Sequence, residues 1–111
     1  MKLVNALLNS LRGLKQTWSH ENAFQLEVMG CVLILPLLIW IRGEKTDKLF
    51  VVFSLALMLI AELLNTALEK ANDALKKEND PLIKFSKDAA SAAVLISCFL
   101  VVYSLLNLII F

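Results

Sequence analysis

The sequence contains little glycine or proline, and this scarcity excludes several kinds of nucleotide-binding site. Its 111 residues include three glycines, at positions 13, 30 and 43, and two prolines. The Walker A loop and the signature of protein kinases both need closely spaced glycines, which allow the backbone to approach a phosphate group. If this chain handles ATP, it must therefore do so through metal ions and side chains.

Cysteine and histidine are scarce as well, and the net charge is small. Cys31 and Cys98 both lie inside apolar runs, so they indicate packing rather than a disulfide framework or a metal site. His20 has no cysteine or second histidine near it to complete a zinc site. The net charge is only +1, and no basic stripe with interleaved aromatics appears, which argues against nucleic acid as a partner.

Apolar residues, in contrast, are abundant. They make up 59% of the chain, and the mean hydropathy is +0.71. A soluble domain of this size could not bury so much apolar surface. The chain is also too short for a catalytic domain with a separate membrane anchor. We therefore expect residues 1–111 to form one integral-membrane domain.

The spacing of the apolar residues predicts an all-α membrane protein. Over residues 1–20 the apolar residues recur every three or four positions, and Trp18 lies near the end of this segment. The basic residues Lys2, Arg12 and Lys15 fall largely on another side of the helical wheel. This pattern is typical of a helix lying in the membrane interface. Ser86 is expected to cap the last span. Three longer apolar stretches are predicted to cross the membrane, at about 23–41, 49–68 and 89–111.

The basic residues predict the orientation. Residues 1–20 and 69–88 together hold eight Lys and Arg, residues 42–48 hold three, and residues 89–111 hold none. Under the positive-inside rule, the amino terminus and the second loop lie in the cytoplasm and the carboxyl terminus lies outside.

A polar stripe crosses the boundary of the second span, in the run AELLNTALEKAND at residues 61–73. On a helix, Glu62, Glu69 and Asp73 fall within about 20° of one line, with Asn65 about 60° away. A solvated helix end explains Asp73, but Glu62 lies about 10 Å deeper than Glu69. Ionisable groups at such depth usually face a bundle interior and belong to a functional site.

Further charges gather at the same cytoplasmic level. Glu21 and Glu27 stand near the start of the first span, and Lys87 and Asp88 near the start of the third. Carboxylate oxygens beside a lysine suit a Mg²⁺ ion with a phosphate ligand. The deeper Glu62 is left for proton transfer at the edge of the lipid.

Three segments together resemble the prokaryotic diacylglycerol kinase family. They are WSHENAFQLE at residues 18–27, ELLNTALEKAND at residues 62–73 and KDAASAAVL at residues 87–95. The resemblance covers nearly the whole chain without a gap, and the combination of the last two motifs is highly specific.

The resemblance implies a small homotrimeric kinase of the bacterial inner membrane, with active sites shared between subunits. Such enzymes use Mg²⁺–ATP to phosphorylate diacylglycerol, giving phosphatidic acid. By its motifs, Glu62 is the general base, and Glu21 and Glu69 bind the metal. The implied nucleotide contacts are Lys2, Asn9, Glu21, Glu69, Glu78, Asn79, Asp80, Lys87 and Asp88. The implied lipid contacts are Ser10, Trp18, Ala23, Phe24, Glu27, Trp40, Lys48, Glu62, Asn65 and Ser91.

The chain departs from the family pattern at four positions. Lys2 stands where a phosphate-contacting arginine is expected, so the charge remains without the bidentate fork. Asn9 replaces a tyrosine near the nucleotide, and Gln25 and Leu26 are less polar than in diacylglycerol-specific members. Related enzymes phosphorylate undecaprenol, which remains an alternative substrate.

Two further alternatives belong to other classes of protein. Small multidrug transporters have a similar length and an intramembrane glutamate, but they have four spans and few cytoplasmic carboxylates. A structural trimer without catalysis would explain neither the stripe at Glu62 nor the pair Lys87–Asp88.

Overall fold

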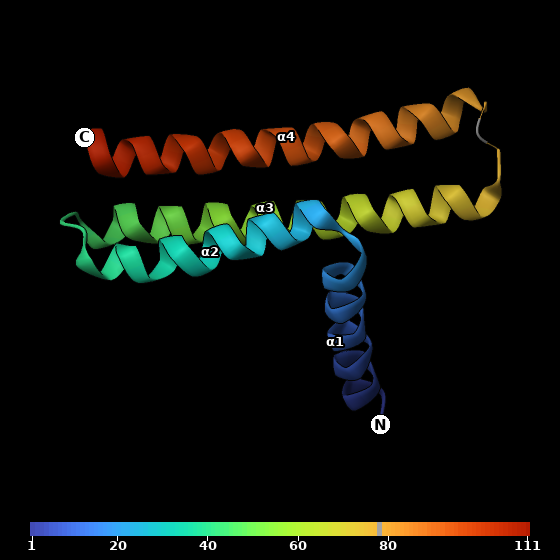
Figure 1. Cartoon of the computed structure of the whole chain (residues 1–111), viewed down its shortest axis with the longest axis horizontal. Coiled ribbons are helices and arrows are strands. Elements are labelled where there is room, and N and C mark those ends of the chain that lie inside the picture. Colours follow the sequence, from blue (N-terminus) through green and yellow to red (C-terminus); the bar gives the residue numbers. More distant parts are fainter. Residues whose placement is uncertain (78) are drawn as a thin grey trace.

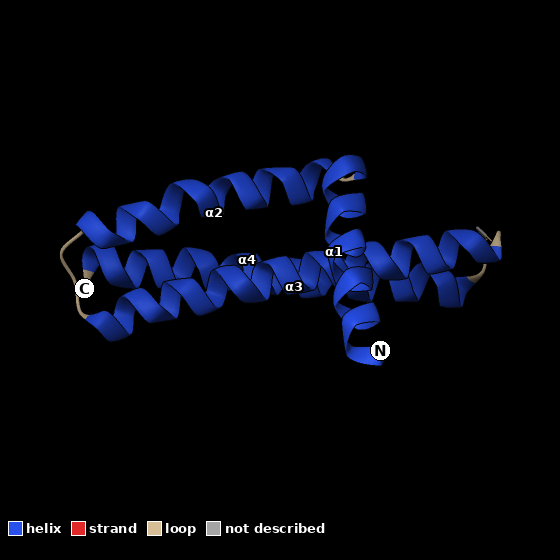
Figure 2. Ribbon diagram, turned by 90° about the horizontal axis from the view of Figure 1, so that it is seen from below, coloured by secondary structure: helices blue, strands red, loops and turns tan. Residues whose placement is uncertain are grey.

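The computed structural model describes residues 1–77 and 79–111, which form four α-helices and no strand. They are α1 (Lys2–His20), α2 (Asn22–Trp40), α3 (Lys45–Leu75) and α4 (Pro81–Ile110). Helices α2, α3 and α4 run alongside one another, whereas α1 leaves this bundle at a steep angle (Figure 1). The view from below shows the same arrangement (Figure 2). The all-α fold expected from the sequence is thereby confirmed.

Helices α2, α3 and α4 are each long and apolar enough to cross a membrane. Their outer surfaces carry large apolar side chains, such as Phe53 on α3 and Phe99 on α4, which are 67% and 65% exposed. Lipid is the solvent that suits such surfaces. The three expected spans therefore coincide with α2 and with the apolar parts of α3 and α4.

The expected loop at 69–88 is mostly helical, so the sequence analysis was wrong there. Helix α3 continues to Leu75 and ends at Lys76, whose φ of 55° is left-handed. Helix α4 already begins at Pro81, where the proline ring sets a helical φ and needs no hydrogen bond. The Asp80 side chain caps it by accepting a hydrogen bond from the Leu82 N–H at 2.8 Å. Ser86 thus lies inside α4 and is not its cap.

The bundle is held together mainly where α3 packs against α4. Val51 and Ser54 of α3 and Ser104 of α4 are essentially inaccessible to solvent. The two serine Oγ atoms lie 2.9 Å apart and link the helices. Such small side chains let two helix backbones approach closely in lipid. Cys31 also belongs to this buried cluster, as expected for a packing residue.

Candidate active site

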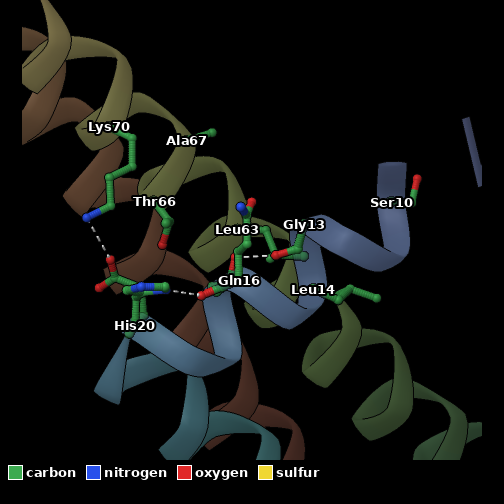
Figure 3. A pocket seen from close by; sticks show the side chains of 11 residues that line it. Ser10, Gly13, Leu14, Gln16, His20, Leu63, Thr66, Ala67 and Lys70 are labelled. Carbon is green, nitrogen blue, oxygen red and sulfur yellow. Dashed lines mark hydrogen bonds and ion pairs between the residues drawn. The ribbon is translucent and has the colours of Figure 1, made fainter. Parts of the chain in front are cut away.

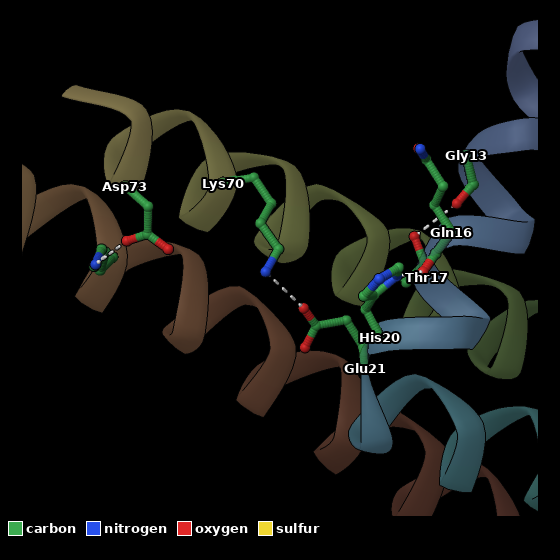
Figure 4. A network of polar contacts seen from close by, with 8 residues as sticks. Gly13, Gln16, Thr17, His20, Glu21, Lys70 and Asp73 are labelled. Carbon is green, nitrogen blue, oxygen red and sulfur yellow. Dashed lines mark hydrogen bonds and ion pairs between the residues drawn. The ribbon is translucent and has the colours of Figure 1, made fainter. Parts of the chain in front are cut away.

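The junction between α1 and α2 is a single residue, Glu21, and it faces α3. Its backbone is extended, with φ −117° and ψ 109°. Its N–H donates to the Thr17 carbonyl at 2.9 Å, and its own carbonyl accepts from the Gln25 N–H at 3.2 Å. The Gln25 side chain donates to the Trp18 carbonyl, which ties α2 back to α1. This bonding holds the Glu21 side chain at the corner, beside Lys70 (Figure 4).

A cavity of about 770 Å³ separates α1 from α3 at this corner. Thr66 and Lys70 of α3 face Gln16 and His20 of α1 across it (Figure 3). The remaining lining residues are Ser10, Gly13, Leu14, Thr17, Glu21, Leu63 and Ala67. A cavity that is largely apolar with a few polar groups is typical of a small-molecule site.

Four carboxylates, those of Glu21, Glu27, Glu62 and Glu69, gather beside the cavity. Glu62 is only 5% exposed. The carboxylates of Glu21 and Glu69 lie near enough to interact with its charge, and so does that of Glu27 from α2. None of the hydrogen bonds among the described residues satisfies the Glu62 carboxylate. Such a cluster of like charges needs a cation or bound protons to offset its repulsion.

Two polar atoms at this level are buried without a hydrogen-bond partner in the described part of the chain. They are Oε2 of Glu27 and Oγ1 of Thr66, which precedes Lys70 by one helical turn. An unsatisfied buried polar group costs about 1–3 kcal/mol. Buried polar groups in native proteins usually have a partner, so these two atoms are available to bind a ligand, an ion or water.

The donor groups at the corner fit a Mg²⁺ ion that arrives with a nucleotide. Within residues 1–77 and 79–111, no three His, Cys, Asp or Glu side chains lie close enough to form a preformed metal site. Mg²⁺ usually binds through one or two carboxylates and the phosphates of its substrate rather than through a complete protein cage. Glu21 and Glu69 offer such oxygen donors, from the α1–α2 corner and from α3.

Most of the expected nucleotide contacts lie where α3 ends and α4 begins. Lys87 Nζ donates to Asp73 Oδ1 at 2.9 Å, and Lys84 Nζ to Asp88 Oδ2 at 2.8 Å. Asn79 is exposed in the turn between the helices. Asp80 caps α4, and Glu78 lies outside the described residues. Lys2 and Asn9 are exposed on α1 and do not line the cavity.

The expected lipid contacts are spread over several surfaces. Ser10 lines the cavity, and Phe24 is buried, whereas Trp18, Ala23 and Ser91 are exposed. Trp18, Ala23 and Phe24 lie within three residues of Glu21, at the α1–α2 corner.

Three more expected lipid contacts do not line the cavity between α1 and α3. Trp40 and Lys48 lie at the opposite end of the bundle, where α2 ends and α3 begins. Asn65 lines a second cavity, of about 570 Å³, with Ser86 between α3 and α4. In a single chain Trp40 and Lys48 do not share one site with Glu62, whereas Asn65 lies about one turn from Glu62 on α3 and faces the other cavity.

Sequence reasoning missed Lys70 and Thr66. Lys70 Nζ lies 3.4 Å from Glu21 Oε1, so it contacts an expected metal ligand. The signal was present, because Lys70 follows Glu69 directly and falls about 80° from Glu62 on the helical wheel. Thr66 looked like an ordinary helical residue until α1 was placed opposite it.

Comparison with known proteins supports the resemblance. The family model for prokaryotic diacylglycerol kinase matches residues 8–111. A diacylglycerol kinase of Escherichia coli strain K12 is 31% identical over 96 residues, covering 86% of this chain and 79% of that protein. One from Haemophilus influenzae is 32% identical over 95 residues, covering 86% and 80%. One from Helicobacter pylori strain 26695 is 33% identical over 95 residues, covering 86% and 74%.

Proposed function

Because this chain belongs to the prokaryotic diacylglycerol kinase family, we propose that it transfers the γ-phosphoryl group of Mg²⁺–ATP to diacylglycerol, giving phosphatidic acid. Membership makes the chain a multi-pass bacterial membrane protein and a lipid kinase, not a transporter. A homotrimer in the inner membrane, with the amino terminus in the cytoplasm and the carboxyl terminus outside, is part of the proposal.

The observation that carries this proposal is the position of Glu62. Its carboxylate is almost fully buried within α3, next to Glu21 and Glu69 and one turn from the cavity-lining Thr66. A lipid hydroxyl stays near the membrane interface, because moving it outward would drag acyl chains into water. The depth of Glu62, close to the cavity between α1 and α3, supports its proposed contact with the reacting hydroxyl of a lipid.

Three of the four carboxylates are proposed to take part in the reaction. Glu62 accepts the proton of the lipid hydroxyl as the oxygen attacks the γ-phosphorus in line. The bond between this phosphorus and the β–γ bridging oxygen breaks, and ADP leaves. Glu21 and Glu69 would hold Mg²⁺, which supplies positive charge to the phosphate oxygens when it is bound. The order of depth along α3 supports the proposal of proton transfer by Glu62 and metal binding by Glu69.

The helix extensions beyond the membrane are proposed to bind the nucleotide. Asp88 and the turn with Asn79 and Asp80 lie there, and Lys87 adds a positive charge. The ion pair of Lys87 with Asp73 holds α3 and α4 together at this end. Lys2 of α1 supplies a further cation near the interface.

Phosphoryl transfer by the purified chain in detergent micelles tests the proposal. The assay follows label from the γ-position of ATP into lipid, with diacylglycerol, with undecaprenol and without either. We expect Mg²⁺-dependent label in phosphatidic acid, and little with undecaprenol. Labelling of undecaprenol alone would identify the other substrate of the family, and no transfer to either lipid would refute the kinase assignment.

A further inference from the structure

Lys70 connects the α1–α2 corner to α3. Its Nζ lies 3.4 Å from Glu21 Oε1, and its side chain lines the cavity between α1 and α3 (Figure 4). Among the three ion pairs of the described residues, this is the one that involves an expected metal ligand. Any metal bound to Glu21 must therefore compete with Lys70.

The Lys70–Glu21 pair has the longest N···O distance of the three ion pairs. The other two, Lys84–Asp88 and Lys87–Asp73, are hydrogen bonds of 2.8 and 2.9 Å. The side chain of Lys70 is 63% exposed, so water also screens its charge. Exposed ion pairs without a short hydrogen bond contribute little and exchange partners readily. Lys70 can therefore leave Glu21 at small cost.

The charges of the carboxylate cluster indicate which group Lys70 contacts after it leaves Glu21. Lys70 offsets one of the negative charges of Glu21, Glu62 and Glu69. A divalent cation at Glu21 makes that offset unnecessary, and the phosphates of ATP bring new negative charge to the same corner. A lysine carries a compact charge on a flexible stem of four carbons. The Lys70 ammonium group can therefore move from Glu21 to a phosphate oxygen of ATP at the same corner.

We propose that Lys70 is a phosphate-binding residue that pairs with Glu21 in the nucleotide-free protein and transfers to a phosphate oxygen when Mg²⁺–ATP binds. The inference rests on the proposed function, since it assumes that Glu21 holds the metal. It gives Lys70 two opposite effects: it competes with a metal ion alone and strengthens binding of the metal–nucleotide complex.

Lys70→Met separates the two effects, because methionine keeps the helix and removes the charge. In micelles without lipid alcohol, Mn²⁺ alone should bind the variant roughly threefold more tightly, measured by electron paramagnetic resonance. Mg²⁺–ATP should bind it about tenfold more weakly, measured by equilibrium dialysis with labelled ATP. Lys70→Arg, which keeps the charge, should restore both affinities toward those of the unsubstituted protein.

Lys15→Met is the matched control, because Lys15 is an exposed lysine of α1 outside the cavity and outside the ion pairs of the described chain. It should change neither affinity. Parallel weakening of Mn²⁺ and Mg²⁺–ATP in Lys70→Met would reveal a structural role only and overturn the inference, as would unchanged affinities. The unsubstituted protein is assayed for lipid phosphorylation alongside, so failure of the proposed function shows separately as absent activity.

Discussion

Glu62 differs from its neighbours Glu69 and Asp73 in depth rather than in chemistry. All three lie on one stripe of α3, but Glu62 is 5% exposed, whereas the side chain of Asp73 is 59% exposed and paired with Lys87. Burying a carboxylate without a partner is costly. A role in stability therefore does not explain Glu62, and this is why we propose a role in proton transfer for it.

The metal ligands can be tested one residue at a time. Glu21→Gln or Glu69→Gln replaces an anionic oxygen donor by a neutral amide of the same size. We expect the apparent affinity for Mg²⁺–ATP to fall roughly tenfold or more. Raised Mg²⁺ should restore part of the activity. A Mg²⁺ titration of the kinase activity measures both effects, and unchanged affinity in both variants would contradict the metal assignment.

At the scale of helices, the contact between α3 and α4 depends on two serines. Ser54 and Ser104 share one hydrogen bond, and each also has a backbone carbonyl, of Val51 or Val101, 2.8 Å away. Each hydroxyl has one proton, so the two serines can make only two of these three bonds at once. Their small size matters more than their polarity, because both side chains are almost fully enclosed.

Size and polarity can be separated at Ser104. Ser104→Ala keeps the close approach of the helices and should lower the free energy of unfolding by about 0.6 kcal/mol. Ser104→Leu must push the helices apart and should lower it by about 1–3 kcal/mol. Denaturant titration of both variants in mixed micelles measures the difference. Equal losses in the two variants would show that the hydrogen bond, and not the packing, holds α3 to α4.

Apolar periodicity predicted the existence of the helices well and their ends poorly. The first helix and first span were placed within a residue or two, because Glu21 interrupts both patterns. The end of α3 and the start of α4 were missed, because there the chain turns polar while remaining helical. Asp80 with Pro81 was a stronger start signal than Ser86. Depth along α3 singled out Glu62 from the sequence alone. The signal for Lys70, which follows Glu69 directly, was present but was not used, and Thr66 could be recognised only once α1 was placed.

At the scale of the whole molecule, orientation decides whether the site can meet ATP. The site lies toward the end of the bundle that holds the turn between α3 and α4, opposite the turn between α2 and α3 (Figure 1). ATP is cytoplasmic, so the proposal requires the α3–α4 turn to face the cytoplasm. The excess of basic residues near that end agrees with this requirement.

Single cysteines report the orientation in intact cells. Cys31 and Cys98 pack among apolar side chains, so replacing both by Ala should leave the activity nearly unchanged. In that background, Glu44→Cys should react with a membrane-impermeant maleimide from outside. Lys77→Cys should react only after the membrane is permeabilised. The reverse labelling pattern would place the site away from ATP and contradict the proposal.

The most direct test of the whole account is the kinetics and nucleotide binding of Glu62→Gln. The substitution removes the proton acceptor, keeps the shape and relieves the cost of a buried charge, so the bundle should remain folded. General-base catalysis contributes a factor of about 10²–10⁴, so kcat with diacylglycerol should fall by roughly this factor while Mg²⁺–ATP still binds. A Glu62→Gln protein with near-normal turnover would contradict the central claim that this buried carboxylate accepts the proton of the lipid.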